Sequence, residues 1–384
     1  MSGRWICCSL CLLILFGIPA EASAAECTDS WIGPGEGSWT AGVNWSAGHA
    51  PGETDVACIG AGKTVKLTAA GANSVRGLQG GGVLALTEST LAVTGTSDTW
   101  QIGSLRMNYK GNLSGAGSLE VTNAFEWNSE SSMSGTGRTI LGSSAVSTIG
   151  SANVWFTLDG RTLVNKGTIT QEEYSILNPV QAGVFENLGT YHMNARGSFW
   201  QVSSDGTGRI VNLGLFEKNV GSGEAKLATN FENFGTIKVS VGKLRFEEAG
   251  HTVVFGDGGS LEGPIVCEKN SVVLGAVNAS NSVLTLKSSQ ASVAAGKTAS
   301  IGTLVDEGTL GGPGTLKISG ALIWEGALTG TGSTVIESSA TATVRSYWAS
   351  LGQRTFINNG VLSLEEQGTI NASEGAVLEN NART

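Results

Sequence analysis

The feature of this sequence that most restricts its fold is internal repetition. Three segments of the first half return in the second half at offsets of 193 to 197 residues. The matched pairs are 113–121 with 310–318, 133–140 with 328–335, and 161–169 with 354–362. Trp127 recurs as Trp324, and Trp155 recurs as Trp348. A unit of about 195 residues is therefore expected twice, with the second copy ending mid-unit.

A shorter period lies inside this unit. The motif Asn-x-Gly recurs at spacings of 22, 25 and 21 residues, beginning at Asn165, Asn187, Asn212 and Asn233. Gly-x-Gly pairs and short runs of alternating apolar and polar residues fall between such marks, which is a strand pattern. A near-constant period of this kind favours stacked coils over sequential hairpins.

We therefore expect an all-β chain folded as a right-handed parallel β-helix, in which each strand pairs with its counterpart one coil further on. Gly and Asn would occupy the turns because they adopt positive φ at low cost. Leu, Val, Ile and Phe would face inward, and Thr, Ser and charged residues would face water. Residues 61–384 would form about 15 coils of about 22 residues. A β-sandwich is the alternative, with strands about every 8–12 residues and no long-range repeat.

Composition narrows the classes of function. Hydrophobic residues make up 40% of the 384 residues, so a large core can be buried. The net charge of −9 argues against nucleic acid and anionic membranes as partners. Only three His are present, which leaves little material for a His-based metal site. We expect no metal and no cofactor.

The N-terminus has the pattern of a secretion signal. Arg4 precedes an apolar run over 5–18, and 22–24 reads A-S-A, a cleavage pattern. A lipoprotein signal is the alternative because cysteines lie nearby, although they lie inside the apolar run rather than after it. We therefore expect residues 1–24 to be a signal peptide and the mature chain to be secreted or held at the cell surface. No later stretch has about 18 uninterrupted apolar residues, so no membrane span is expected in the mature chain.

Three cysteines remain after the signal. Cys27 and Cys58 flank one short segment, so we predict a disulfide that closes a loop of about 30 residues and contributes about 3–4 kcal/mol. Residues 25–60 would form an N-terminal cap over the open end of the solenoid. Cys267 is predicted to be buried on a strand, with a disulfide to a partner chain as the alternative. No C-terminal cap is visible, so either the chain is a fragment of a longer protein or another chain covers this end.

A tryptophan-containing motif opens the predicted mature chain: Trp39-x4-Asn44-Trp45-x5-Pro51-x3-Asp55-Val56-Ala57. Followed by Gly- and Asn-punctuated coils, it resembles the start of secreted bacterial right-handed β-helix proteins, which include passenger-like and haemagglutinin-like surface proteins. The resemblance implies an adhesin-like rod. No sorting motif and no C-terminal membrane-barrel pattern accompany it.

Enzymatic motifs are sparse. Polysaccharide lyases and hydrolases on β-helices need clustered carboxylates, but the seven Asp after the signal are scattered. The adjacent pairs Glu172-Glu173, Glu247-Glu248 and Glu365-Glu366 would point to opposite faces of a strand. Nucleophile-elbow, zinc-protease and phosphate-loop motifs are absent from the sequence. We predict no catalytic residue.

Tryptophan gives the better functional hint. Exposed indole rings at regular axial spacing can stack on sugar rings, whereas buried ones fill the core. We select Trp155, Trp200 and Trp348 as candidate contact residues. The function expected is a non-enzymatic adhesion module that binds surface glycans or other cell-surface proteins; the alternative is a polysaccharide lyase or glycoside hydrolase. A groove with three carboxylates and an Arg would favour the enzyme, and a smooth Ser, Thr and Asn face would favour the adhesin.

Overall fold

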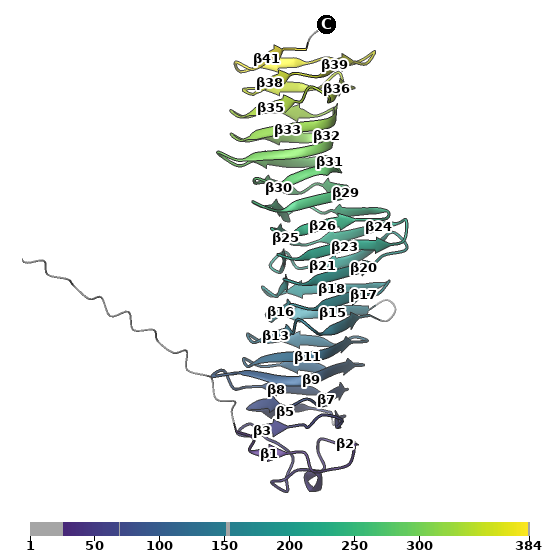
Figure 1. Ribbon diagram of the computed structural model, residues 1–384, viewed down its shortest axis with the longest axis vertical. Helices are drawn as coiled ribbons and strands as arrows, with labels where there is room; N and C mark the ends of the chain where they lie inside the picture. The colour runs from purple at the N-terminus through teal and green to yellow at the C-terminus, as the bar shows by residue number, and fades with distance from the viewer. Residues whose placement is uncertain (1–25, 69, 151–153, 383–384) are drawn as a thin grey trace, which may run out of the picture.

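The computed structural model describes residues 26–68, 70–150 and 154–382, and the predicted signal segment lies outside them. The chain winds into a rod of about 15 coils of parallel strands, and the only helical turn of the described residues is the 3₁₀ turn Gly42–Asn44 (Figure 1). This confirms the predicted parallel β-helix and excludes the β-sandwich. No helix within the described ranges is both long enough and apolar enough to cross a membrane.

Each coil contributes a strand to each of three sheets, here called sheets 1, 2 and 3 in chain order. Six long strands run through a corner and belong to more than one sheet: β9 (Thr99–Asn108), β11 (Ser118–Trp127), β29 (Ser260–Glu268), β31 (Asn278–Val293), β32 (Thr298–Gly311) and β33 (Thr315–Trp324). The other strands of sheet 1 are β13 (Arg138–Leu141), β16 (Thr162–Asn165), β19 (Val184–Asn187), β22 (Arg209–Asn212), β25 (Asn230–Asn233), β28 (Thr252–Phe255), β30 (Ser271–Leu274), β34 (Ala327–Leu328), β37 (Ser350–Gly352) and β40 (Asn371–Ser373).

Sheets 2 and 3 are built in the same way. The short strands of sheet 2 are β2 (Glu36–Ser38), β4 (Thr64–Leu67), β7 (Val83–Thr87), β14 (Val146–Ile149), β17 (Thr168–Gln171), β20 (Thr190–Asn194), β23 (Leu215–Val220), β26 (Thr236–Val239), β35 (Ser333–Ile336), β38 (Thr355–Asn358) and β41 (Val377–Asn380). Those of sheet 3 are β5 (Ala72–Val75), β8 (Thr90–Val93), β10 (Asn112–Ser114), β12 (Ser132–Ser134), β15 (Val154–Asp159), β18 (Ser175–Val180), β21 (Phe199–Ser203), β24 (Glu224–Ala228), β27 (Lys243–Phe246), β36 (Thr341–Val344) and β39 (Val361–Leu364).

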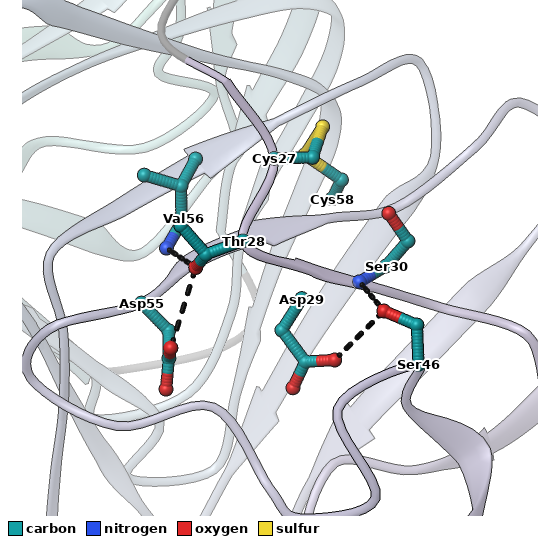
Figure 2. The surroundings of a disulfide bond; sticks show 8 residues. All are labelled: Cys27, Thr28, Asp29, Ser30, Ser46, Asp55, Val56 and Cys58. Atoms are coloured by element: carbon teal, nitrogen blue, oxygen red, sulfur yellow. Dashed lines mark hydrogen bonds between the residues drawn. A yellow bond between two sulfur atoms is a disulfide. The ribbon is translucent and has the colours of Figure 1, made fainter.

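The N-terminal segment forms its own small sheet of β1 (Asp29–Ser30), β3 (Val56–Cys58) and β6 (Gly77–Gln79). The predicted Cys27–Cys58 disulfide is present and joins residues 31 positions apart (Figure 2). Beside it, the Thr28 hydroxyl accepts a hydrogen bond from the Val56 N–H at 2.8 Å and donates one to Asp55 at 3.3 Å. Trp31, Trp39 and Trp45 are buried together nearby, with edge-to-face rings 5.1 Å apart.

The asparagines of the Asn-x-Gly motifs do not form turns, which corrects the expectation from the sequence. None of the described asparagines has positive φ. Asn165, Asn187, Asn212 and Asn233 are instead buried in register on sheet 1, and the side-chain amides of the first three each donate to the side-chain carbonyl of the next at 2.7–2.8 Å. Stacking satisfies the inward polar groups of this ladder except the Asn165 side-chain carbonyl oxygen, which has no partner, and it fixes the register of neighbouring coils.

The glycine of Asn-x-Gly is required by close approach of the backbone rather than by φ. A Cβ at Gly189 would lie 2.1 Å from the carbonyl oxygen of Gly167, and one at Gly214 would lie 2.1 Å from that of Gly189. The first glycine of Gly-x-Gly does occupy the predicted left-handed region, with φ of 96° at Gly115 and 91° at Gly312.

The core also departs from the expected division into apolar inside and charged outside. Arg161, Lys218, Asp306 and Arg354 are all buried. Most of the interior is apolar, as expected, with ladders of Leu, Val, Ile and Phe stacked from coil to coil. Cys267 is also buried on β29, as the simpler of the two readings predicts.

The two buried arginines make matching contacts. The five N–H groups of Arg161 donate to Thr139 Oγ1 and to the carbonyls of Gly115, Gly117, Ser134 and Arg138 at 2.8–3.3 Å. Arg354 donates to Thr334 Oγ1 and to the carbonyls of Gly312, Gly314, Thr329 and Ser333 at 2.7–3.4 Å. Every acceptor of Arg354 lies 195 or 197 positions after its counterpart for Arg161. Burial lowers the pKa of each guanidinium to about 10, so both stay charged at neutral pH.

The two matching segments do not lie on the same sheets. Leu119 of β11 belongs to sheet 1, whereas its counterpart Leu316 of β33 belongs to sheet 2. Following the pairings along sheet 1 from β11 to β32 gives nine coils, and β33 then follows on the next sheet. Equivalent residues are therefore separated by nine coils plus one face of the rod.

Candidate functional site

The three candidate tryptophans do not form one patch. Trp155 lies on β15 of sheet 3 and is 50% exposed. Trp200 lies two coils further along the same sheet, on β21, and is half-buried. Trp348 is 82% exposed in the turn before β37, which belongs to sheet 1. The structure thus brings Trp155 and Trp200 onto one face and places Trp348 on another.

Trp155 is the freer of the two rings on sheet 3. Its neighbour one coil on is Ile176, which is partly exposed and forms a short apolar strip with Trp155. The Lys226 ammonium lies 5.6 Å from the centroid of the Trp200 ring and covers one side of it. At about 4.8 Å per coil, Trp155 and Trp200 are about 10 Å apart along the rod axis.

A row of uncharged polar side chains runs beside this strip on the outer face of sheet 3. Its members occupy successive coils in register: Thr90, Asn112, Ser132, Thr157 and Asn178. The Asn112 side-chain oxygen Oδ1 accepts hydrogen bonds from the Ser132 N–H and hydroxyl, both at 2.8 Å. The Asn178 amide lies 3.5 Å from Thr157 Oγ1. These residues make an uncharged row of Ser, Thr and Asn side chains.

An ionic cluster lies further along the same sheet. Arg245 contacts Glu224 at 2.8 Å, Glu247 at 3.9 Å and Glu268 through a hydrogen bond. This is the combination of three carboxylates and an Arg that would favour an enzyme. A hydrogen bond from Arg245 lowers the pKa of Glu224. At Glu268, burial alone would raise the pKa, but Arg245 and Lys287 outweigh it and the pKa is lowered.

The electrostatics of this cluster oppose acid catalysis. A general acid needs a carboxyl group whose pKa is raised toward the working pH, and Glu224 and Glu268 are shifted the other way. Arg245 is also held by its carboxylates, with a raised pKa caused first by the Glu224 hydrogen bond. The arrangement is that of an ion-pair ladder between coils.

The described outer surface has several shallow depressions, one of about 400 Å³ beside Asn359 and Asn381 and two that lie on the sheets of the candidate tryptophans. Of these two, one, of about 290 Å³, is lined by Thr90 and Asn112 of the polar row together with Gly71, Glu88, Ser89 and Lys110. The other, of about 450 Å³, lies on sheet 1 and is lined by neutral residues that include Gln290, Thr309 and Thr329. Within the described parts of the chain, no group of three or more His, Cys, Asp or Glu side chains is placed to hold a metal ion.

The remaining repeated tryptophans belong to the core. Trp127 and Trp324 are fully buried, and their indole N–H groups donate to the carbonyls of Ser131 at 3.0 Å and Gly326 at 3.1 Å. Sequence reasoning missed the polar row beside Trp155. The signal was available: Thr157 and Asn178 recur as Ser350 and Asn371 at the offset that pairs the tryptophans.

Comparison with known protein families, with curated proteins and with solved structures finds no match to this chain.

Proposed function

We propose that this chain is a secreted or cell-surface rod that binds polysaccharide without cleaving it, in the manner of passenger-like and haemagglutinin-like surface proteins. The observation that carries the proposal is the half-exposed Trp155 ring beside an uncharged row of hydroxyl and amide groups. An indole ring supplies an apolar platform for the C–H face of a pyranose, and the neighbouring polar groups can hydrogen-bond its hydroxyls.

The sheet 3 face favours an extended, uncharged glycan. The polar row continues through five coils without a charged member. Each coil advances by about 4.8 Å, which is similar to the length of one sugar unit in an extended chain. A polysaccharide that lies parallel to the rod axis would therefore meet a new polar side chain at every unit.

The alternative, a lyase or hydrolase, has the Arg245 cluster in its favour. Its carboxylates are compensated by Arg245 and neighbouring lysines, and their pKa values are lowered at Glu224 and Glu268. We therefore assign this cluster to coil-to-coil stabilisation.

The test measures binding of the chain from residue 25 onward to xylan, mannan, β-glucan and polygalacturonate. We expect binding to at least one neutral polysaccharide in affinity electrophoresis. Substitution of Trp155, Trp200 and Trp348 together by Ala should weaken it at least tenfold, which corresponds to about 1.4 kcal/mol. The Phe234→Ala variant is the matched control, because Phe234 is an exposed aromatic residue at a different corner.

The same incubations report on catalysis. Appearance of new reducing or unsaturated ends that stops in an Arg245→Gln variant would support the enzyme and contradict the proposal. Binding that survives in the triple tryptophan variant would also contradict it, because the aromatic platforms would then be irrelevant.

A further inference from the structure

A second copy of the Trp155 face exists on a different side of the rod. The three residues that define the first face have counterparts 193 positions later: Trp155 with Trp348, Thr157 with Ser350, and Asn178 with Asn371. On sheet 3, Thr157 and Asn178 are partners on adjacent strands. On sheet 1, Ser350 and Asn371 are partners in the same way.

The correspondence extends to the coils on the N-terminal side of each tryptophan, here described as the coils below it. On sheet 3 the polar row descends from Thr157 through Ser132 to Asn112 and Thr90. On sheet 1 the register descends from Ser350 through Ala327 to Thr309 and Gln290. Both rows are uncharged.

The two shallow depressions occupy corresponding positions on the two faces. The depression on sheet 3 is lined by Asn112 and Thr90, two and three coils below Thr157. The depression on sheet 1 is lined by Thr309 and Gln290, two and three coils below Ser350. An exposed indole, an uncharged row and a shallow hollow thus recur in the same relative places, and the sheet 3 hollow differs from the other in having Glu88 and Lys110 in its lining.

The two faces differ in what surrounds the indole. Trp348 is more exposed than Trp155 and stands next to Tyr347, which is itself 54% exposed. The Asn371 amide donates to the carbonyls of Tyr347 at 3.0 Å and Ala349 at 3.3 Å, so it supports the turn that carries Trp348. The second face is therefore the one with the larger aromatic surface.

We infer that the rod is bivalent, with one glycan site centred on Trp155 and a second centred on Trp348. This inference rests on the proposed function. Nine coils at about 4.8 Å place the sites about 45 Å apart along the axis. Because they lie on different sheets, one straight polysaccharide chain parallel to the axis cannot occupy both. The rod would therefore bridge two chains, and immobilised polysaccharide would retain it by avidity.

The experiment measures stoichiometry and bridging separately. Isothermal titration of the full chain with xylohexaose, mannohexaose and cellohexaose should give two sites per chain for the hexasaccharide that binds. Trp155→Ala and Trp348→Ala should each leave one site, and the double variant should leave none. Both indoles are exposed, so these variants should keep the circular dichroism of the parent; Trp→Phe at either position should retain the site. Retention on a polysaccharide-coated surface should fall about a hundredfold in each single variant.

The outcomes separate the two proposals. No binding by the unaltered chain refutes the proposed function and this inference with it. A single site that Trp155→Ala abolishes and Trp348→Ala leaves intact refutes the inference while the proposed function stands. Two sites that both survive either substitution refute the assignment of the indoles.

Discussion

The buried Asp306 makes the stability of the coils around it depend on pH. This carboxyl group lies on β32 between the strands that carry Leu286 and Trp324, and it is fully shielded from solvent. One of its oxygens accepts a hydrogen bond from the Gly308 N–H at 3.2 Å, and the other has no protein partner. Burial raises its pKa to about 7, against a weaker lowering by the Gly308 hydrogen bond.

The sign and size of the pH dependence that Asp306 causes in the free energy of unfolding follow from proton linkage. In the unfolded chain the pKa of an Asp is about 3.9, so between about pH 4 and pH 7 the folded state holds the proton more tightly than the unfolded state does. The free energy of unfolding therefore falls as pH rises through this window, and the full penalty is present above pH 7. A pKa difference of about 3 corresponds to a penalty of about 4 kcal/mol.

An Asp306→Asn variant removes the ionisation and keeps the size. The free energy of unfolding of the variant minus that of the parent should be about 4 kcal/mol larger at pH 8 than at pH 4. The cost of burying an amide is the same at both pH values and cancels in this comparison. Urea unfolding of both proteins, followed by far-ultraviolet circular dichroism across that range, measures it. The control is Glu374→Gln, which removes a carboxylate exposed to solvent. A parent-to-variant difference that is constant across the range would refute the reasoning.

Two further predictions concern the buried polar groups. Arg161→Met should lower the free energy of unfolding by about 3 kcal/mol or more, because it leaves several buried carbonyls without a donor. Arg354→Met should lower it by a similar amount. Widely different losses in the thermal unfolding of the two variants would contradict the matching networks. Asn187→Asp should also destabilise the rod at pH 7, since a carboxylate cannot donate to Asn212 or Leu215. Burial would raise the pKa of the new carboxyl group, so the variant should recover part of its lost stability as pH falls through that pKa. Urea denaturation midpoints that do not change with pH would contradict the ladder.

The coil architecture was predictable because its signals are local. Alternation, turn residues and the repeated spacing specify stacked strands without reference to distant contacts. The Cys27–Cys58 pairing followed from the closeness of the two residues in sequence. Strand alternation could also have predicted which tryptophans face the core. Trp127 lies two residues after the inward Phe125 and therefore points inward, whereas Trp155 directly precedes the inward Phe156 and points outward.

The roles of the buried polar residues could not be read in this way. Asn is favoured both in turns and in stacked amide ladders, and the choice depends on which side of the sheet faces the core, which a shift of one residue reverses. Arg161 would be assigned to the surface by its charge alone. Its burial depends on carbonyls that come from two neighbouring coils, and only the structure brings these together.

The step of nine coils and one face between the matching segments gives the molecule an approximate threefold screw. Each further unit of the same length would turn its indole by another third of a revolution. A third unit would present it on the remaining side, and a fourth would return it to the azimuth of the first. Arrays lengthened by this step would distribute equivalent contact points evenly around their circumference, whereas a unit of whole coils would align them all in one direction.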